Sequence, residues 1–256
     1  MLLVIDVGNS NNVIGLYSGS KLVTHWRIRT EKNRTADEYW VLIKEFIQLH
    51  KVEAETIDDI MVACVVPPLT PILKEMGVKY FSREPMMVGP GMRTGISILY
   101  RNPAEVGADI IVNSVAAYEK YGGPIIIIDF GTATTFDVVS KNGEYLGGII
   151  FPGIQISMEA LFSNTAKLPR VEMVMPKSVI GKSTVESIQS GAVNGFVGMV
   201  DTIITKIREE VGCPMQVVAT GGVVDWISEQ SEHIDVVDPF LTLEGLRIVH
   251  EKNKNP

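Results

Sequence analysis

The chain has 256 residues, a formal net charge of −7 and 46% hydrophobic residues, a composition that can bury a sizeable globular core. The acidic balance argues against nucleic acid or an anionic membrane surface as the main partner. It leaves anionic small molecules open, because backbone N–H groups and a metal ion can together form a phosphate site.

Cysteine use and apolar segments bear on the compartment. Cys64 and Cys213 are far apart and have no CxxC spacing, so we expect both to pack as small apolar side chains. The apolar run over residues 1–5 is too short for a signal peptide or a membrane span. We therefore expect a cytoplasmic protein.

The chain begins with a buried strand that ends in a polar turn. Residues 2–5 are continuously apolar and lead into the turn Asp6-Val7-Gly8-Asn9-Ser10. Residues 13–17 and 21–28 have the composition of two further strands, joined as a hairpin.

The rest of the first half alternates helices and strands. The capping-box spacing at residues 35–38 predicts a helix, and residues 60–66 predict a buried strand. The segment between Pro85 and Pro103 is rich in Gly and Pro and is expected to be a functional loop. A helix from Pro103 to about Tyr121 is expected to follow it.

After Gly122 the pattern of the first half starts again. An apolar strand over 125–128 leads into Asp129-Phe130-Gly131-Thr132-Ala133-Thr134-Thr135. The later predicted elements are a hairpin over 136–151, helices over 154–164 and 185–211, a strand over 215–219 ending in Thr220-Gly221-Gly222, and a helix over 242–252. Since the repeat spacing is nearly half the chain, we predict two similar α/β lobes, residues 1–121 and 122–256, with a cleft between them.

The two repeated turns have the groups that a phosphate site requires. Gly8 lets the backbone approach a ligand closely, residues 9–12 offer donors to phosphate oxygens, and Asp6 can hold Mg²⁺ directly or through water. Residues 129–135 repeat this arrangement with threonines as donors. Each turn alone could be an ordinary polar turn or the start of a strand. Their occurrence on two matching lobes favours a nucleotide site.

The order of these motifs resembles the superfamily of acetate kinases, sugar kinases, heat-shock ATPases and actin, and within it the type III pantothenate kinases. The resemblance covers essentially the whole chain. It implies two actin-like, ribonuclease H-like lobes with mixed sheets. It also implies ATP-dependent phosphorylation of the primary hydroxyl of pantothenate to 4'-phosphopantothenate, the first step of coenzyme A biosynthesis, by a homodimer. The residues that carry it are Asp6 to Ser10, Asn102-Pro103, Glu105 to Asp109, Asp129 to Thr135, Gly147-Gly148, Pro152-Gly153, Thr165 to Pro169, Gly181 to Thr184, Ser190-Gly191, Thr220 to Gly222 and Leu243 to Leu246.

The same resemblance implies roles for individual positions. Asp109 corresponds to the proposed catalytic base, Asp6 to a residue near Mg²⁺, and Asp129 to the ligand of a monovalent cation, K⁺ or NH₄⁺. The implied ATP contacts are Asp6, Val7, Gly8, Asn9, Ser10, Asn11, Asn12, Val13, Thr132, Gly221 and Gly222. The implied pantothenate contacts are Tyr100, Gly107, Ala108, Asp109, Ile110 and Thr184.

One position departs from the family's pattern. Ile110 stands where the family usually has an arginine, a side chain well suited to a carboxylate substrate. Another cation could replace it, namely Arg93, Arg101 or Lys167. The alternatives are weak affinity for pantothenate, a different hydroxyl substrate, or a catalytically silent regulatory homologue. Silence is disfavoured because the chain retains Asp6, Asp109, Asp129 and Thr132.

Overall fold

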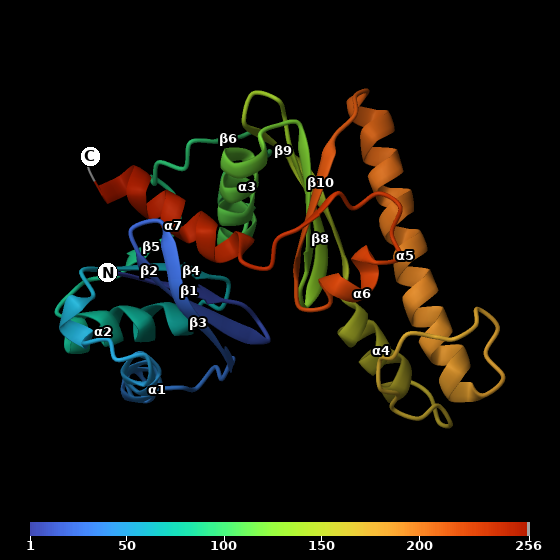
Figure 1. Ribbon diagram of the computed structural model, residues 1–256, viewed down its shortest axis with the longest axis horizontal. Coiled ribbons are helices and arrows are strands. Elements are labelled where there is room, and N and C mark those ends of the chain that lie inside the picture. The colour runs from blue at the N-terminus through green and yellow to red at the C-terminus, as the bar shows by residue number, and fades with distance from the viewer. Residues whose placement is uncertain (255–256) are drawn as a thin grey trace. The chain divides into compact units, whose positions relative to one another are not determined.

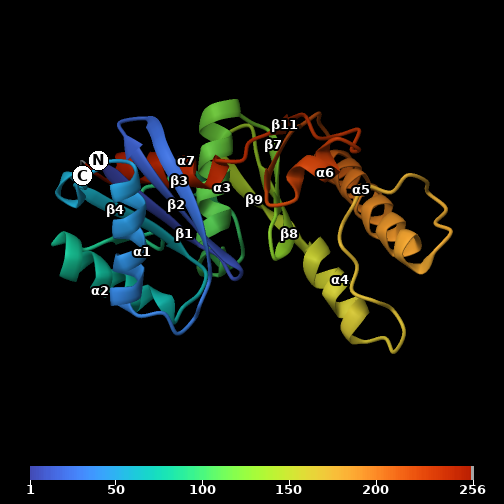
Figure 2. The same cartoon turned by 60° about the horizontal axis from the view of Figure 1, so that its bottom comes forward.

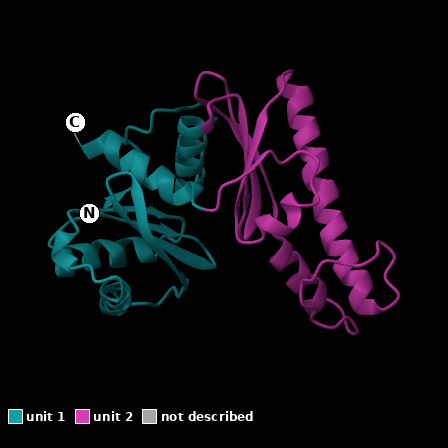
Figure 3. Cartoon of the chain, viewed as in Figure 1, with its two compact units in different colours: residues 1–120, 240–256 teal, residues 121–239 magenta. Residues whose placement is uncertain are grey.

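The computed structural model describes residues 1–254 (Figure 1 and Figure 2). It contains two compact units, residues 1–120 with 240–256, and residues 121–239 (Figure 3). Each unit has its own sheet and its own apolar core. None of the helices in the described part of the chain is long and apolar enough to span a membrane.

The sheet of unit 1 has the strand order β3-β2-β1-β4-β5. Its strands are β1 (Leu2–Val7), β2 (Asn11–Ser18), β3 (Lys21–Arg29), β4 (Asp59–Cys64) and β5 (Met86–Met87). β1, β2 and β3 are antiparallel neighbours, whereas β4 runs parallel to β1 and β5 parallel to β4. The unit's other elements are α1 (Ala36–Leu49), α2 (Leu69–Phe81), β6 (Ser97–Ile98), α3 (Ala108–Tyr121), α7 (Leu241–Lys254) and 3-10 turns at Ala54–Thr56 and Pro103–Glu105.

Helices cover both faces of this sheet, with α1 and α2 on one face and α7 on the other (Figure 1). Alternate residues of β1 point to the α1 side, where Leu3, Ile5 and Val7 pack with Tyr39 and Ile43 in one buried cluster. The central strand β1 is therefore buried on both faces, which explains the continuous apolar run at the start of the chain.

The C-terminal helix α7 belongs with unit 1, whereas the predicted second lobe extended to residue 256. Its apolar face packs on β1, and Leu243 lies against Gly15 of β2, where any side chain would clash with it. A β-carbon on Gly245 would likewise overlap the backbone of Val112 in α3. This docking depends on close approach between distant segments, so no local pattern near residue 240 could predict it.

The strands that unit 2 contributes to the second sheet have the order β11-β10-β7-β8-β9. Its strands are β7 (Ile125–Phe130), β8 (Ala133–Val139), β9 (Glu144–Pro152), β10 (Gln216–Gly221) and β11 (Val236–Val237). Its helices are α4 (Ile154–Ser163), α5 (Thr184–Val211) and α6 (Val224–Ser228). Ile126, Ile128 and Phe136 of the sheet pack against Val200 and Ile204 of α5, which runs along the sheet (Figure 1).

The two sheets repeat one topology. β7 pairs with β8 antiparallel and with β10 parallel, as β1 pairs with β2 and β4. β9 and β11 then correspond in strand order to β3 and β5. The predicted duplication of a mixed α/β sheet is confirmed.

The helix predicted from Pro103 begins later than expected. Pro103–Glu105 forms a 3-10 turn, Val106 is extended, and α3 starts at Ala108. Asn102 caps the short turn with its side chain, which accepts from the amide of Ala104. The proline therefore starts a separate turn, and the backbone changes direction before α3.

Candidate functional site

The first repeated turn joins β1 to β2 in unit 1. The amide of Gly8 donates to the carbonyl of Asn11 at 3.1 Å, which closes the turn. Asn9, Ser10 and Asn11 are exposed, so their side chains and amides lie on the side that a ligand can reach. Asn12 is fully buried instead, because alternate residues of β2 face the α1 side of the sheet.

Asp109 occupies the second position of α3. One carboxylate oxygen accepts from the amide of Ile110 at 2.8 Å. Burial raises the pKa of the Asp109 carboxyl above its ordinary value, and the hydrogen bond from Ile110 only partly opposes this effect.

Val65 lies between the first turn and the segment that carries Asp109, within unit 1. The amide of Val65 donates to the carbonyl of Val7, the last residue of β1, at 3.0 Å. A β-carbon on Gly107 would lie 3.8 Å from the Val65 side chain and would overlap the Asp109 carboxylate. Val65 thus contacts the end of β1 and lies beside the segment that carries the carboxylate.

The second turn, in unit 2, gathers the other predicted ATP contacts. The amide of Gly222 donates to the carbonyl of Phe130 at 3.1 Å, so the end of β10 lies against the residue that follows Asp129. Gly221 has φ +105°, and a β-carbon there would lie 2.6 Å from the Phe130 nitrogen. The structure therefore places Gly221 and Gly222 beside the turn that holds Asp129 and Thr132.

Glycines also shape the rest of this second turn. The amide of Gly131 donates to the carbonyl of Ala133, and the amide of Gly153 donates to the carbonyl of Thr132, both at 3.0 Å. A β-carbon on Gly131 would approach the Asp129 carboxylate to 3.7 Å, so this carboxylate lies close to the bare backbone. Such an approach of carboxylate and backbone suits a site for a small ion or a phosphate.

The predicted acceptor contacts are divided between the units. Tyr100, 40% exposed, lies in the loop before α3 in unit 1, together with Gly107, Ala108 and Ile110. Thr184 is the first residue of α5 in unit 2, where Ser183 caps the helix by accepting from the amide of Glu186.

Thr184 also lines a cavity of about 1090 Å³ between α4 and α5. Apolar side chains form most of its wall, including Phe151, Leu161, Phe196 and Met199. The glycines of α5 leave further open space beside it, since a β-carbon on Gly191 or Gly195 would have no neighbour within 4 Å.

The candidate replacements for the absent arginine lie on exposed segments. Arg101 and Lys167 are exposed, and the backbone of Arg93 is bonded at both its N–H and its carbonyl to the side chain of Asn253. Ile110 itself is partly buried at the start of α3.

Each predicted metal site has a single carboxylate as its protein ligand. Among residues 1–254, no group of at least three His, Cys, Asp or Glu side chains could hold a metal ion. Asp6 and Asp129 each stand at the carboxyl end of a central strand, beside a glycine turn. This donor set fits Mg²⁺ bound through one or two carboxylates plus substrate phosphates.

Sequence reasoning missed a buried carboxylate and two residues under the first turn. Asp137, 2% exposed, accepts from the hydroxyls of Thr135 at 2.9 Å and Tyr145 at 3.0 Å. An aspartate inside the apolar run of β8 was the available signal for it. Thr30 and Tyr39 contact the first turn from its buried side, and their spacing along the sequence carries no such signal.

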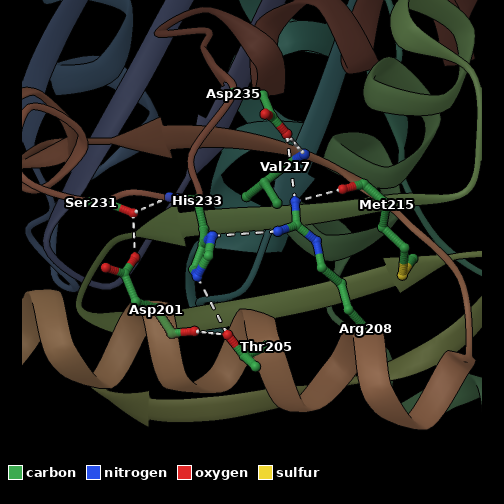
Figure 4. Close-up of polar contacts among 8 residues, drawn as sticks. All are labelled: Asp201, Thr205, Arg208, Met215, Val217, Ser231, His233 and Asp235. Atoms are coloured by element: carbon green, nitrogen blue, oxygen red, sulfur yellow. Dashed lines mark hydrogen bonds and ion pairs between the residues drawn. The ribbon is translucent and has the colours of Figure 1, made fainter.

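Asp201, Ser231 and His233 have the composition of a hydrolase triad but not its connections (Figure 4). The Ser231 hydroxyl donates directly to Asp201, while the His233 ring contacts Thr205 and Arg208. A triad needs the imidazole between the hydroxyl and the carboxylate. This cluster therefore ties the segment before β11 to α5 and has no activated nucleophile.

The sequence model of the type III pantothenate kinase family matches residues 2–206. This chain belongs to the type III pantothenate kinase family. It is 54% identical over 254 residues to the type III pantothenate kinase of Anaeromyxobacter sp. (strain K), covering 99% of this chain and 100% of that protein. It is 52% identical over 253 residues to that of Myxococcus xanthus (strain DK1622), with 99% of both chains covered.

Solved structures of lower identity share the fold. A conserved putative Baf family transcriptional activator from Campylobacter jejuni has a TM-score of 0.61 at 20% identity, covering 99% of this chain and 100% of that chain. The activator of 2-hydroxyisocaproyl-CoA dehydratase from Clostridium difficile, with bound ADPNP, has a TM-score of 0.56 at 12% identity, covering 99% of this chain and 96% of that one. A putative 2-dehydro-3-deoxygalactonokinase from Sinorhizobium meliloti has a TM-score of 0.59 at 10% identity, covering 100% of both. These likenesses confirm the predicted actin-like kinase fold.

Proposed function

We propose that this protein transfers the γ-phosphoryl group of ATP to the primary hydroxyl of pantothenate in the cytoplasm, giving 4'-phosphopantothenate and ADP. The observation that carries the proposal is the half-buried Asp109 carboxylate with its raised pKa, which lies in the same unit as the first turn. Val65 lies beside Gly107 and is bonded to the end of β1, so the two segments share a neighbour. The identity of 52–54% to type III pantothenate kinases along almost the whole chain supports the choice of substrate.

Asp109 acts as the base in this reaction. The substrate hydroxyl oxygen forms a bond to the γ-phosphorus, the bond from that phosphorus to the β–γ bridging oxygen breaks, and the hydroxyl proton passes to Asp109. Because phosphoryl transfer has a loose transition state, the base accepts its proton late and mainly orients the hydroxyl. The raised pKa of Asp109 suits this role, since it brings the carboxylate closer to a proton acceptor of useful strength.

The polar turns bind the nucleotide. Residues 6–13 of unit 1 contact the phosphates through the exposed amides and side chains of Asn9 to Asn11. Thr132, Gly221 and Gly222 of unit 2 are the second set of ATP contacts, and the missing side chain at Gly221 lets the end of β10 lie against the Phe130 backbone. The side chain of Asn12 is buried, so we assign it a structural role beneath the turn.

Cations complete the proposed nucleotide site. Asp6 would hold Mg²⁺ and Asp129 a monovalent cation, K⁺ or NH₄⁺. Bound there, these ions would neutralise charge that develops on the phosphate oxygens. The protein's own contribution is to hold each carboxylate at a strand end beside a glycine, where phosphate and ion can approach closely.

The acceptor contacts in this proposal are Tyr100, Gly107, Ala108 and Ile110 around Asp109, with Thr184 from unit 2. Ile110 cannot pair with the pantothenate carboxylate, because it has no charge or hydrogen-bond donor on its side chain. An exposed cation from the loops, Arg101 or Lys167, is the candidate partner for that carboxylate. The same observation favours a second candidate function, a kinase of this fold acting on an uncharged hydroxyl substrate.

We also propose that the protein is a homodimer formed through unit 2. Val179, Ile180 and Ile150 are 73%, 79% and 72% exposed, and they belong to a large group of exposed apolar side chains on α4, β9 and the segment before α5. A large number of exposed apolar side chains on one unit is typical of an interaction site. Thr184 begins α5 next to this surface, so a second copy would cover a predicted acceptor contact.

The test uses purified protein with Mg-ATP, with and without pantothenate, in K⁺ or Na⁺ buffer, measuring ADP release and 4'-phosphopantothenate by mass spectrometry. ADP release that requires pantothenate and disappears in Asp109→Asn supports the proposal. ATP turnover with other hydroxyl compounds but not with pantothenate would favour the second candidate. Tight ATP binding without any turnover would overturn both and leave a regulatory protein.

A further inference from the structure

We infer that Thr30, together with Asn12 and Tyr39, positions the first phosphate turn from beneath and so sets the affinity for ATP. The inference rests on the proposed ATP site and adds residues to it that do not touch the ligand. Thr30 follows β3, Asn12 begins β2 and Tyr39 lies in α1, so three separate elements meet under one turn.

Thr30 is bonded to the turn at two points. Its hydroxyl donates to the carbonyl of Gly8 at 2.6 Å, and its amide donates to the carbonyl of Ser10 at 3.0 Å. Two of the carbonyls of the turn are therefore held by one residue. A threonine can do this because it offers a backbone donor and a side-chain donor a few ångströms apart.

The Thr30 hydroxyl is itself held in place by a buried network of hydrogen-bonded side chains. Its single proton is shared between the Gly8 carbonyl and the side-chain oxygen of Asn12, which lies 2.7 Å away, and the Asn12 amide nitrogen donates to the Tyr39 hydroxyl at 2.7 Å. Asn12 and Tyr39 are both 0% exposed. Burial raises the pKa of Tyr39, so its hydroxyl is neutral and can accept at any pH at which the protein is assayed.

The direction of the held carbonyls decides where the amides of the turn point. In a trans peptide the C=O of one residue and the N–H of the next point in opposite directions. Because the Gly8 and Ser10 carbonyls point to Thr30, the amides of Asn9 and Asn11 point away from it. Asn9 and Asn11 are exposed, so this arrangement aims two N–H donors at the side from which a phosphate would approach.

A purely structural role would have a different consequence. If Thr30 only added stability, its loss would lower the melting temperature and leave the affinity for each substrate unchanged. If it orients the amides, its loss weakens ATP binding specifically, because a mobile turn must be ordered each time ATP binds. The affinity for the acceptor, which contacts other residues, stays the same.

The experiment compares Thr30→Val, which keeps the β-branched shape, with Thr30→Ser, which restores the hydroxyl. Thr24→Val is the matched control, because Thr24 lies on β3 and its hydroxyl bonds to His50 at 3.0 Å, away from the turn. Calorimetry measures the Kd for Mg-ATP, and steady-state kinetics measure KM for ATP and for pantothenate. We expect Thr30→Val to raise Kd and KM for ATP by roughly five- to tenfold, the size of one or two lost hydrogen bonds.

The expected pattern includes unchanged pantothenate KM in Thr30→Val, and near-native ATP affinity in Thr30→Ser and Thr24→Val. Tyr39→Phe removes the hydroxyl that accepts from Asn12 but keeps the aromatic ring, and we expect it to weaken ATP binding by about two- to threefold. This variant decides the question if Thr30→Val does not fold. Equal effects on both substrates, or ATP affinity unchanged in both Thr30→Val and Tyr39→Phe, would overturn the inference.

The calorimetric measurement separates this inference from the proposed reaction. Wild-type protein that binds Mg-ATP but does not phosphorylate pantothenate would contradict the proposed function alone, and the comparison of variants would still be decisive. Wild-type protein that binds no Mg-ATP would overturn both.

Discussion

Gly107 leaves open the space that the carboxylate of Asp109 occupies, since a β-carbon at residue 107 would overlap Oδ1 of Asp109. The glycine at position 107, two residues before the proposed catalytic carboxylate, is therefore required for steric reasons, without any special backbone conformation. Any side chain at this position would force the carboxylate into another rotamer or shift the start of α3.

Gly107→Ala should displace the Asp109 carboxylate and lower kcat by about 10²-fold, the loss that an ångström of misplacement can cause. Steady-state assays measure the change, and circular dichroism checks that the fold is kept. Gly89→Ala is the matched control, because a β-carbon there would have its nearest neighbour, the Met87 carbonyl, at 4.0 Å. Equal activity of Gly107→Ala and wild type would show that the carboxylate has room to move.

The pH dependence of kcat should have an acid limb above 3.8, the ordinary pKa of an aspartate, because burial raises the pKa of Asp109. Activity requires the charged form, so kcat falls as pH decreases through this raised pKa. The same pKa shift affects the stability of the fold in the opposite direction from its effect on kcat. The protonated carboxyl favours the folded state, and that contribution is present below pH 3.8 and is lost as pH rises through the folded-state pKa.

Asp109→Asn tests the effect of this carboxyl both on kcat and on the stability of the fold. We expect it to lower kcat by about 10²- to 10⁴-fold, as for the loss of a general base, and to raise the melting temperature at pH 7 slightly. Thermal unfolding at pH 4 and pH 7 would show the gain shrinking at the lower pH. A large loss of stability at pH 7 would contradict the assigned burial effect.

Ile110→Arg should improve recognition of a carboxylate acceptor. A guanidinium at the start of α3, beside Asp109, can form charge-assisted hydrogen bonds that are each worth about 1.5–3 kcal/mol, so we expect KM for pantothenate to fall roughly tenfold. KM for ATP should not change. Ile110→Met is the uncharged control, and a similar gain from it would show that size, not charge, limits the affinity.

Arg208→Met should destabilise unit 2 without affecting catalysis. The Arg208 guanidinium donates to the carbonyl of Met215 at 2.8 Å and lies 3.8 Å from Asp235, which in turn accepts from the amide of Val217 (Figure 4). Loss of these contacts should cost about 1–3 kcal/mol because the Met215 carbonyl loses its side-chain donor and Asp235 loses the nearby guanidinium, keeping only the Val217 amide.

The measurement for Arg208→Met is thermal unfolding, with Lys206→Met as the matched control because Lys206 is an exposed cation on the same helix. We expect a fall of roughly 2–10 °C in Tm for Arg208→Met. Little change is expected for Lys206→Met. A lowered kcat in either folded variant would show that this network reaches the site.

Local patterns in the sequence were sufficient to predict most helices and strands and the repetition of their order in the two units. The capping box at Thr35 is formed as predicted, with the Glu38 carboxylate accepting from the Thr35 amide at 2.7 Å. The two turns after apolar strands, at Asp6 and Asp129, stand at corresponding places in two sheets of the same topology. Each of these features depends on residues that are close in the chain, so it can be read from spacing and composition.

Tertiary structure alone decided which side chains of the first turn are exposed and which are buried beneath the turn. Asn12 belongs to the same polar run as Asn9 and Asn11, yet it is buried against Tyr39, a residue 27 positions away. Burial likewise raises the pKa of Asp109, and α7 joins unit 1 through close contacts at Gly15 and Gly245. Burial and solvation are set by segments that pack together from distant parts of the chain, and no local spacing records them.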